Sequence, residues 1–94
     1  MKRYLIEREM PGVGGKTAAE ICHAAEVSNQ AIAQLAPRVQ WQHSYVAGDR
    51  TFCIFLAEDP DGVREHARLS GFPANRIVEI GSIIYPTTAA GAAA

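Results

Sequence analysis

The chain has 94 residues, a formal net charge of −1 and a sequence pI of about 6.3. This length makes one domain, and the near-neutral charge lacks the basic footprint of a nucleic-acid-binding protein. No apolar run approaches the roughly 20 residues of a membrane span, and residues 1–10 lack the apolar stretch of a signal peptide. We therefore expect a cytoplasmic domain with no nucleic-acid or membrane partner, whose Cys22 and Cys53 are free, buried thiols.

The first third of the chain predicts a strand, a loop and a helix. Residues 3–9 predict a strand whose two faces carry Leu5, Glu7 and Glu9, and Tyr4, Ile6 and Arg8. Residues 10–16 hold one proline and three glycines, which is typical of a loop. Thr17 and Glu20 form a capping box, so a helix is expected to begin at Ala18 and to end before Pro37.

The loop has some features of a phosphate-binding loop. Residues 12–17 read Gly-Val-Gly-Gly-Lys-Thr between a predicted strand and a predicted helix. The phosphate-binding motif places its first glycine at Met10, so the loop that starts at Gly12 is two residues short. We interpret it as a connecting loop with Thr17 as the helix cap, with anion binding at the helix N-terminus as the alternative.

Residues 39–58 predict a β-hairpin, because two β-branched and aromatic runs flank Gly48-Asp49. A loop of even length pairs Ser44 with Cys53. A loop of odd length would instead set Cys53 beside His43, because a slip of one residue turns all side chains of a strand to the other face. We favour the even register.

One face of this hairpin is expected to be apolar and to hold one imidazole. The alternation of side chains along the first strand places together Trp41, His43 and Tyr45. In the even register the same face continues on the second strand through Phe52, Ile54 and Leu56. Such a surface is suited to binding a ligand or a partner.

The rest of the chain completes a ferredoxin-like order. Asp59 and Pro60 predict the start of a second helix that ends at Gly71, and residues 76–85 predict a fourth strand. The order β-α-β-β-α-β defines an α+β, ferredoxin-like fold, a four-stranded antiparallel sheet with two helices on one face.

The predicted domain covers residues 1–86, and residues 87–94 are expected to form a flexible, low-complexity tail. Because both helices cover the same face, the other face of the sheet is left bare. A bare apolar face is usually covered by a partner. We therefore predict a homodimer with the two sheets face to face, as in a dimeric α+β barrel.

Four residues are candidates for holding a metal ion. His43 is the strongest, because imidazole is a common ligand of nickel, zinc and copper. Tyr45 lies two residues further along the same face, and Glu7 is the nearest carboxylate, two strands and about 10 Å away. His66 is expected on the inner face of the second helix, opposite Cys53, where a core histidine beside a buried thiol is the commoner outcome. For His43 the alternative is an interface histidine hydrogen-bonded to Tyr45 or to a carboxylate.

Several segments in combination resemble a known family. They are Tyr4-Leu5-Ile6-Glu7-Arg8 with Pro11, His43-Ser44-Tyr45-Val46, Thr51-Phe52-Cys53-Ile54, and Val63-Arg64-Glu65-His66-Ala67-Arg68 followed by Gly71-Phe72-Pro73-Ala74. Over residues 3–86 the chain is similar to the small bacterial nickel-binding, nickel-responsive proteins. The resemblance implies a ferredoxin-like homodimer that binds nickel, in metal storage or buffering, with no known reaction.

The positions of this chain that match the family are Glu7, His43, Tyr45, Cys53 and His66. The chain departs from the family pattern at residues 55–58, where many members have Tyr-Glu-Ala-Pro and this chain has Phe-Leu-Ala-Glu. Leu56 therefore replaces a carboxylate on the face assigned to His43. If that carboxylate is a ligand, metal binding by this protein is weakened or lost.

Three functions follow from these observations. The first is a non-catalytic nickel-binding dimer whose ligands come from His43, Tyr45, Glu7 and His66. The second is a cofactor-free dimeric α+β-barrel enzyme, similar to small monooxygenases and isomerases, with His43 or Glu7 as the proton shuttle and an apolar cavity lined by Trp41, Phe52 and Ile54. The third is a plain interaction module. We favour the first.

Overall fold

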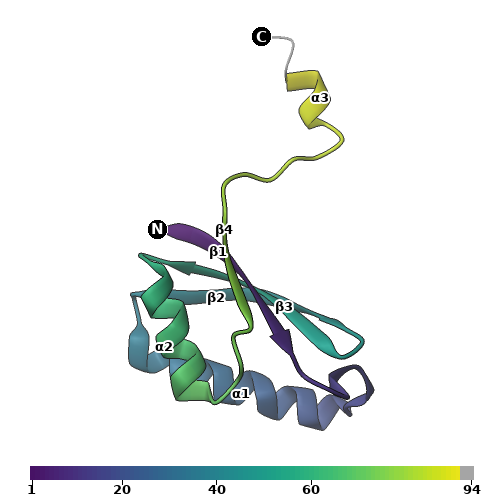
Figure 1. Ribbon diagram of the computed structural model, residues 1–94, viewed down its shortest axis with the longest axis vertical. Helices are drawn as coiled ribbons and strands as arrows, with labels where there is room; N and C mark the ends of the chain where they lie inside the picture. The colour runs from purple at the N-terminus through teal and green to yellow at the C-terminus, as the bar shows by residue number, and fades with distance from the viewer. Residues whose placement is uncertain (92–94) are drawn as a thin grey trace.

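The computed structural model describes residues 1–91 and shows a four-stranded sheet with two helices packed on one face (Figure 1). The strands are β1 (Lys2–Glu9), β2 (Val39–Ala47), β3 (Arg50–Ala57) and β4 (Arg76–Ile80). The helices are η1 (Val13–Gly15, a 3-10 helix), α1 (Ala18–Leu35), α2 (Pro60–Ser70) and α3 (Thr88–Gly91). The strand order β2-β3-β1-β4 and the antiparallel pairings confirm the ferredoxin-like α+β fold.

The two long helices begin where their capping residues predict. The Thr17 hydroxyl accepts the N–H of Glu20, and the Glu20 carboxylate accepts the N–H of Thr17. At the start of α2 the Asp59 carboxylate accepts the N–H of Gly62, and Pro60 occupies the first turn. The helix ends at Gly71, which has a φ of 78°. These local signals fix the two helices that cover the sheet.

The glycine-rich loop packs against the turn of the central hairpin. The Gly12 N–H donates to the Asp49 carboxylate, and the Gly14 N–H donates to the Gly48 carbonyl. A Cβ on Gly14 would lie 2.7 Å from the Gly48 carbonyl oxygen, so this close approach requires glycine. Because these N–H groups are bonded within the chain and a carboxylate lies against them, the loop is a structural connection and no phosphate cradle.

The central hairpin adopts the predicted even register. Ser44 pairs with Cys53, and the two-residue loop is Gly48-Asp49. Gly48 has a φ of 60°, a conformation that glycine adopts without strain. The register directs Cys53 toward the helices, where the thiol is buried.

A β-bulge in β2 contradicts one prediction about the hairpin. Trp41 pairs with Phe55, whereas His43 pairs with Ile54, so Gln42 is the extra residue between them. The bulge reverses the alternation of side chains and turns Trp41 toward the helices, while His43 and Tyr45 lie on the open face, the face of the sheet that the helices do not cover. The prediction that Trp41 shares their face is therefore wrong, and Trp41 packs beside the buried core.

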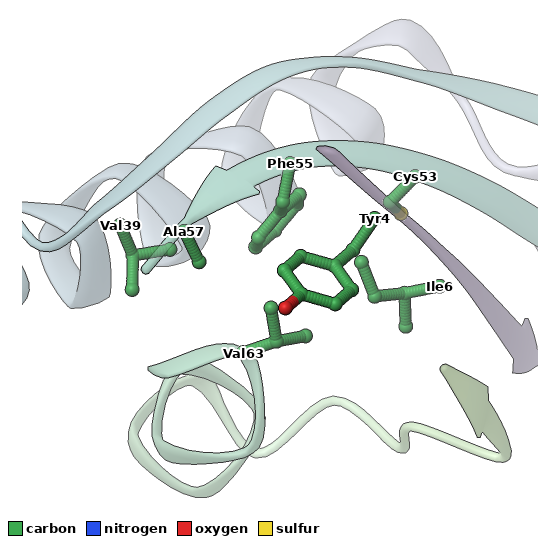
Figure 2. Packing of buried hydrophobic residues seen from close by; sticks show 7 residues of the cluster. All are labelled: Tyr4, Ile6, Val39, Cys53, Phe55, Ala57 and Val63. Atoms are coloured by element: carbon green, nitrogen blue, oxygen red, sulfur yellow. The ribbon is translucent and has the colours of Figure 1, made fainter. Parts of the chain in front are cut away.

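The hydrophobic core lies between the sheet and the helices. Figure 2 shows its members, Tyr4, Ile6, Val39, Cys53, Phe55, Ala57 and Val63. The Tyr4 hydroxyl points toward Val63 in this view and has no hydrogen-bond partner within residues 1–91. Arg8 lies on the same face of β1 as Tyr4 and Ile6, and its side chain is also buried. The alternation of residues 3–9 correctly predicts that Tyr4, Ile6 and Arg8 share one face of β1.

The fourth strand is shorter than predicted, since β4 ends at Ile80 and not at residue 85. Ile80 pairs with Arg3, near the beginning of β1, so residues beyond position 82 have no partner on β1. The chain then leaves the body of the domain, and α3 lies apart from the sheet and both long helices (Figure 1). Of the tail predicted for residues 87–94, α3 is described, and residues 92–94 lie outside the described residues.

Candidate functional site

The open face of the sheet carries the strongest predicted ligands. In strand order, one row of this face runs through Tyr45, Phe52, Glu7 and Arg76, and the next through His43, Ile54, Leu5 and Val78. The central strands contribute partly buried side chains that are apolar except for Glu7, and the edge strand β2 contributes two polar rings. No helix covers this face within residues 1–91 (Figure 1). The bare apolar face predicted from the topology is therefore present, without Trp41.

His43 and Tyr45 form a pair on this face. The His43 Nε2 atom lies 3.2 Å from the Tyr45 hydroxyl oxygen, and the two rings meet edge to face with their centroids 5.2 Å apart. Both side chains are exposed, because β2 lies at the edge of the sheet and no element covers it on this side. The pair offers one imidazole nitrogen and one phenol oxygen within reach of a single bound ion.

Glu7 lies on the same face but has another partner. Its carboxylate accepts from the Arg50 guanidinium at 2.7 Å, and Glu9 lies 3.5 Å from the same guanidinium. Glu7 is opposite Phe52, which is in turn opposite Tyr45, so two strand spacings, about 10 Å, separate the backbones of Glu7 and Tyr45. Within one chain Glu7 therefore does not join the ring pair, and Arg50 neutralises its charge.

His66 lies in the other layer of the molecule. Its side chain is 1% exposed, its Nε2 lies 3.1 Å from the Ser28 hydroxyl, and its ring meets the Phe55 ring edge to face at 4.7 Å. Burial lowers the pKa of His66 to about 4, helped by the positive charge of Arg8, so this imidazole is neutral at pH 7. The sheet separates His66 from His43, and the two cannot bind the same ion.

The described part of one chain does not bring a full set of metal ligands together. Among residues 1–91, no three His, Cys, Asp or Glu side chains gather at one point. Cys53 is buried on the helix side, where its thiol lies 3.7 Å from the Thr51 hydroxyl, and Cys22 is exposed on α1. Both cysteines are free thiols, as predicted, but only Cys53 is buried, so the burial predicted for Cys22 is wrong. The four predicted metal residues thus divide into a pair, an ion-paired carboxylate and a core histidine.

Sequence reasoning missed two residues that line a cavity beneath the helices, Arg8 and Trp41. The alternation of side chains predicts the wrong face for Trp41, because the bulge leaves no clear mark in the pattern of residues 39–47. For Arg8 the alternation with Tyr4 and Ile6 predicts the correct face of β1 but no functional role. A cation on the core-facing side of a strand is a signal that could have identified it.

The topology, the two covering helices and the bare sheet face define a small ferredoxin-like α+β protein. A family model described as "Nickel responsive protein SCO4226-like" matches residues 4–80, and the chain belongs to this family. The fold is similar to the crystal structure of SCO4226 from Streptomyces coelicolor A3(2), with a TM-score of 0.72 over 87% of this chain and 99% of that one, at 15% sequence identity. No curated protein sequence matches the chain.

The family assignment confirms the resemblance to nickel-responsive proteins. At 15% identity, the likeness to the solved structure concerns the fold alone. No helix among the described residues is both long enough and apolar enough to cross a bilayer.

Proposed function

We propose that this protein binds a nickel ion on the open face of its sheet, as a non-catalytic protein of nickel buffering or nickel response. The family to which it belongs is named for a response to nickel. The observation that carries the proposal is the His43–Tyr45 pair, whose donor atoms lie 3.2 Å apart on an uncovered face. Imidazole and oxygen donors together suit Ni²⁺.

We further infer that a second copy of the chain completes the site. Nickel needs more ligands than one imidazole and one phenol, and a two-fold symmetric pair supplies each of them twice. Half-buried apolar side chains surround the donors on this face, chiefly those of Leu5, Phe52 and Ile54. Covering them would remove apolar surface from water, which stabilises the dimer.

The chain beyond β4 provides a second apolar surface for a partner. Ile83, Ile84 and Tyr85 are 50%, 80% and 62% exposed in one copy, in a segment that runs away from the domain (Figure 1). We propose that a second copy covers this segment as well. The free thiols of both cysteines fit a cytoplasmic setting, which we keep as part of the proposal.

Isothermal titration of Ni²⁺ into protein without a histidine tag tests the proposal. We expect saturable binding to the wild type, and binding at least tenfold weaker after His43→Ala. The matched control is His23→Ala, which removes an exposed histidine of α1 whose Nδ1 lies 4.0 Å from Glu26, and should leave the affinity unchanged. No heat with the wild type, or equal affinities for the wild type and His43→Ala, would refute the proposal.

The structure separates the three residues that the enzyme alternative places around one cavity. Trp41 lies on the helix side of the sheet, whereas Phe52 and Ile54 lie on the open side. The three residues therefore do not line one cavity. We accordingly propose no reaction for the open face.

A further inference from the structure

A cavity of about 180 Å³ lies between the helices and the sheet, on the opposite side of the sheet from His43 and Tyr45. Its wall is almost entirely apolar and is formed by side chains of both long helices, the three strands β1, β2 and β3, and the segment after α2. The lining side chains with the most bearing on its character are Ile21, Ala24, Ala25, Trp41, Phe55 and Phe72. A cavity of about 150 Å³ with an apolar wall is large enough to bind benzene.

One cation lines this largely apolar space. Arg8 is 2% exposed, and the one hydrogen bond of its guanidinium in the described part of the chain goes from Nη1 to the carbonyl oxygen of Pro73. Its Cζ atom lies 5.9 Å from the centroid of Phe55 and 6.0 Å from that of Phe72. A guanidinium has five N–H donors, so most of its bonding capacity is not used by the chain as described.

The buried charge of Arg8 has no carboxylate partner within residues 1–91. The neighbouring acids on β1, Glu7 and Glu9, point to the opposite face and bind Arg50. A buried unpaired cation is strongly unfavourable unless another group compensates it. The sequence nevertheless places arginine here, between Ile6 and the strand end, on a face otherwise occupied by core residues.

We propose that this cavity binds a small apolar molecule bearing a single carboxylate, with Arg8 as its ion-pair partner. A guanidinium pairs with a carboxylate through two parallel hydrogen bonds, which makes arginine the usual partner for this group. One carboxylate neutralises one guanidinium, whereas a doubly charged phosphate would leave a net negative charge in an apolar space. The apolar wall and the volume then select a hydrocarbon part about the size of a benzene ring.

The other polar groups of the cavity carry no charge, so the Arg8 guanidinium and a ligand carboxylate would form a neutral ion pair there. The His66 imidazole is held neutral at pH 7 and is bonded to Ser28, and Thr51 and Cys53 are uncharged neighbours on β3. A second hollow shares Met10, Val13, Ile21, Ala24 and Phe72 with the cavity and opens between the start of α1 and the segment after α2. This hollow is the route by which we expect a ligand to enter.

Titration of the full-length protein with benzoate, in buffer containing a metal chelator, tests the proposal separately from nickel binding. Benzamide serves as the neutral control, because it has nearly the same shape without the charge. We expect benzoate to bind the wild type at least tenfold more tightly than benzamide, and Arg8→Met to abolish this preference. Arg64→Met, which removes an exposed arginine of α2 outside the cavity wall, should leave it intact.

A second variant keeps the test decisive if Arg8→Met fails to fold. Ala25→Leu places a larger side chain in the cavity and leaves Arg8 unchanged. Because the space for the ligand shrinks, benzoate binding should weaken at least tenfold. Methyl NMR of the wild type shows where benzoate binds. We expect benzoate to shift the signals of Ile21 and Ala24 and not those of Leu5 or Ile54. Equal affinity of the wild type for benzoate and benzamide, benzoate affinity unaffected by Ala25→Leu, or shifts confined to the open face would overturn the proposal.

Discussion

The neutral, buried state of His66 makes the stability of the protein depend on pH. An ordinary histidine has a pKa of 6.5, and burial together with Arg8 lowers that of His66 to about 4 in the folded protein. As pH falls below 6.5 the unfolded chain takes up a proton at this position and the folded chain does not. The free energy of unfolding therefore falls between about pH 6.5 and pH 4, and below pH 4 this group adds no further loss.

The size of the effect follows from the two pKa values. Each pKa unit corresponds to about 1.4 kcal/mol, so the full difference between 6.5 and about 4 is roughly 3 kcal/mol. At pH 5, where the unfolded histidine is almost fully protonated and the folded one is not, the loss relative to pH 7 is about 2 kcal/mol. This is a large fraction of the 5–15 kcal/mol that stabilises a typical domain.

Urea denaturation at pH 7, 6 and 5 measures this loss, followed by the fluorescence of Trp41, the single tryptophan. Protein concentration is held constant, because association would change the apparent stability. His66→Gln should remove about 2 kcal/mol of the pH dependence, whereas His23→Gln, an exposed histidine, should keep it. Equal losses of unfolding free energy for the wild type and His66→Gln between pH 7 and pH 5 would show that His66 is not the source of the pH dependence.

Three further predictions concern packing and metal uptake. Gly62→Ala should destabilise the protein by about 1–3 kcal/mol, although alanine usually stabilises a helix, because the added Cβ would lie 2.8 Å from Val39 Cγ2. Thermal unfolding measures this loss, with Gly15→Ala as the control because a Cβ there meets no atom within 4 Å. A rise in the Tm of Gly62→Ala would contradict the prediction. Tyr4→Phe should leave the unfolding free energy equal or higher, because it removes a buried hydroxyl without a described partner, so a loss above about 1 kcal/mol in urea denaturation would be inconsistent with the packing. Ni²⁺ affinity should be lower at pH 5 than at pH 7, since protons compete with the metal ion for an imidazole ligand, and equal titration curves at the two pH values would exclude His43 as a ligand.

Much of the fold follows from local signals that tertiary packing does not override. The capping box at Thr17, the start of α2 at Asp59 and the hairpin loop at Gly48 all lie where the sequence predicts. The end of β4 could not be predicted from residues 76–85, because it depends on where the neighbouring strand β1 begins. The bulge at Gln42 is likewise set by how β2 meets β3 and the helices, and it reversed the side of Trp41.

In the candidate site, too, local contacts could be predicted from the sequence and contacts between distant segments could not. The pairing of His43 with Tyr45 depends only on the alternation of side chains after the bulge. The sequence predicts this alternation correctly. The ion pair between Glu7 and Arg50 depends on the register of two strands distant in sequence. The burial of Arg8 depends on Phe72 and Pro73, which follow α2 and fold back over β1. No local pattern carries such contacts.

Size-exclusion chromatography of nickel-loaded, untagged protein tests the central claim most directly, with light scattering for mass and elemental analysis of the eluted peak. The claim is that a nickel ion lies on the open sheet face between two copies of the chain. We predict that nickel elutes with a species of twice the 10.1 kDa chain mass, and that His43→Ala elutes without nickel. Nickel retained by a monomer, or retained by His43→Ala, would contradict the account.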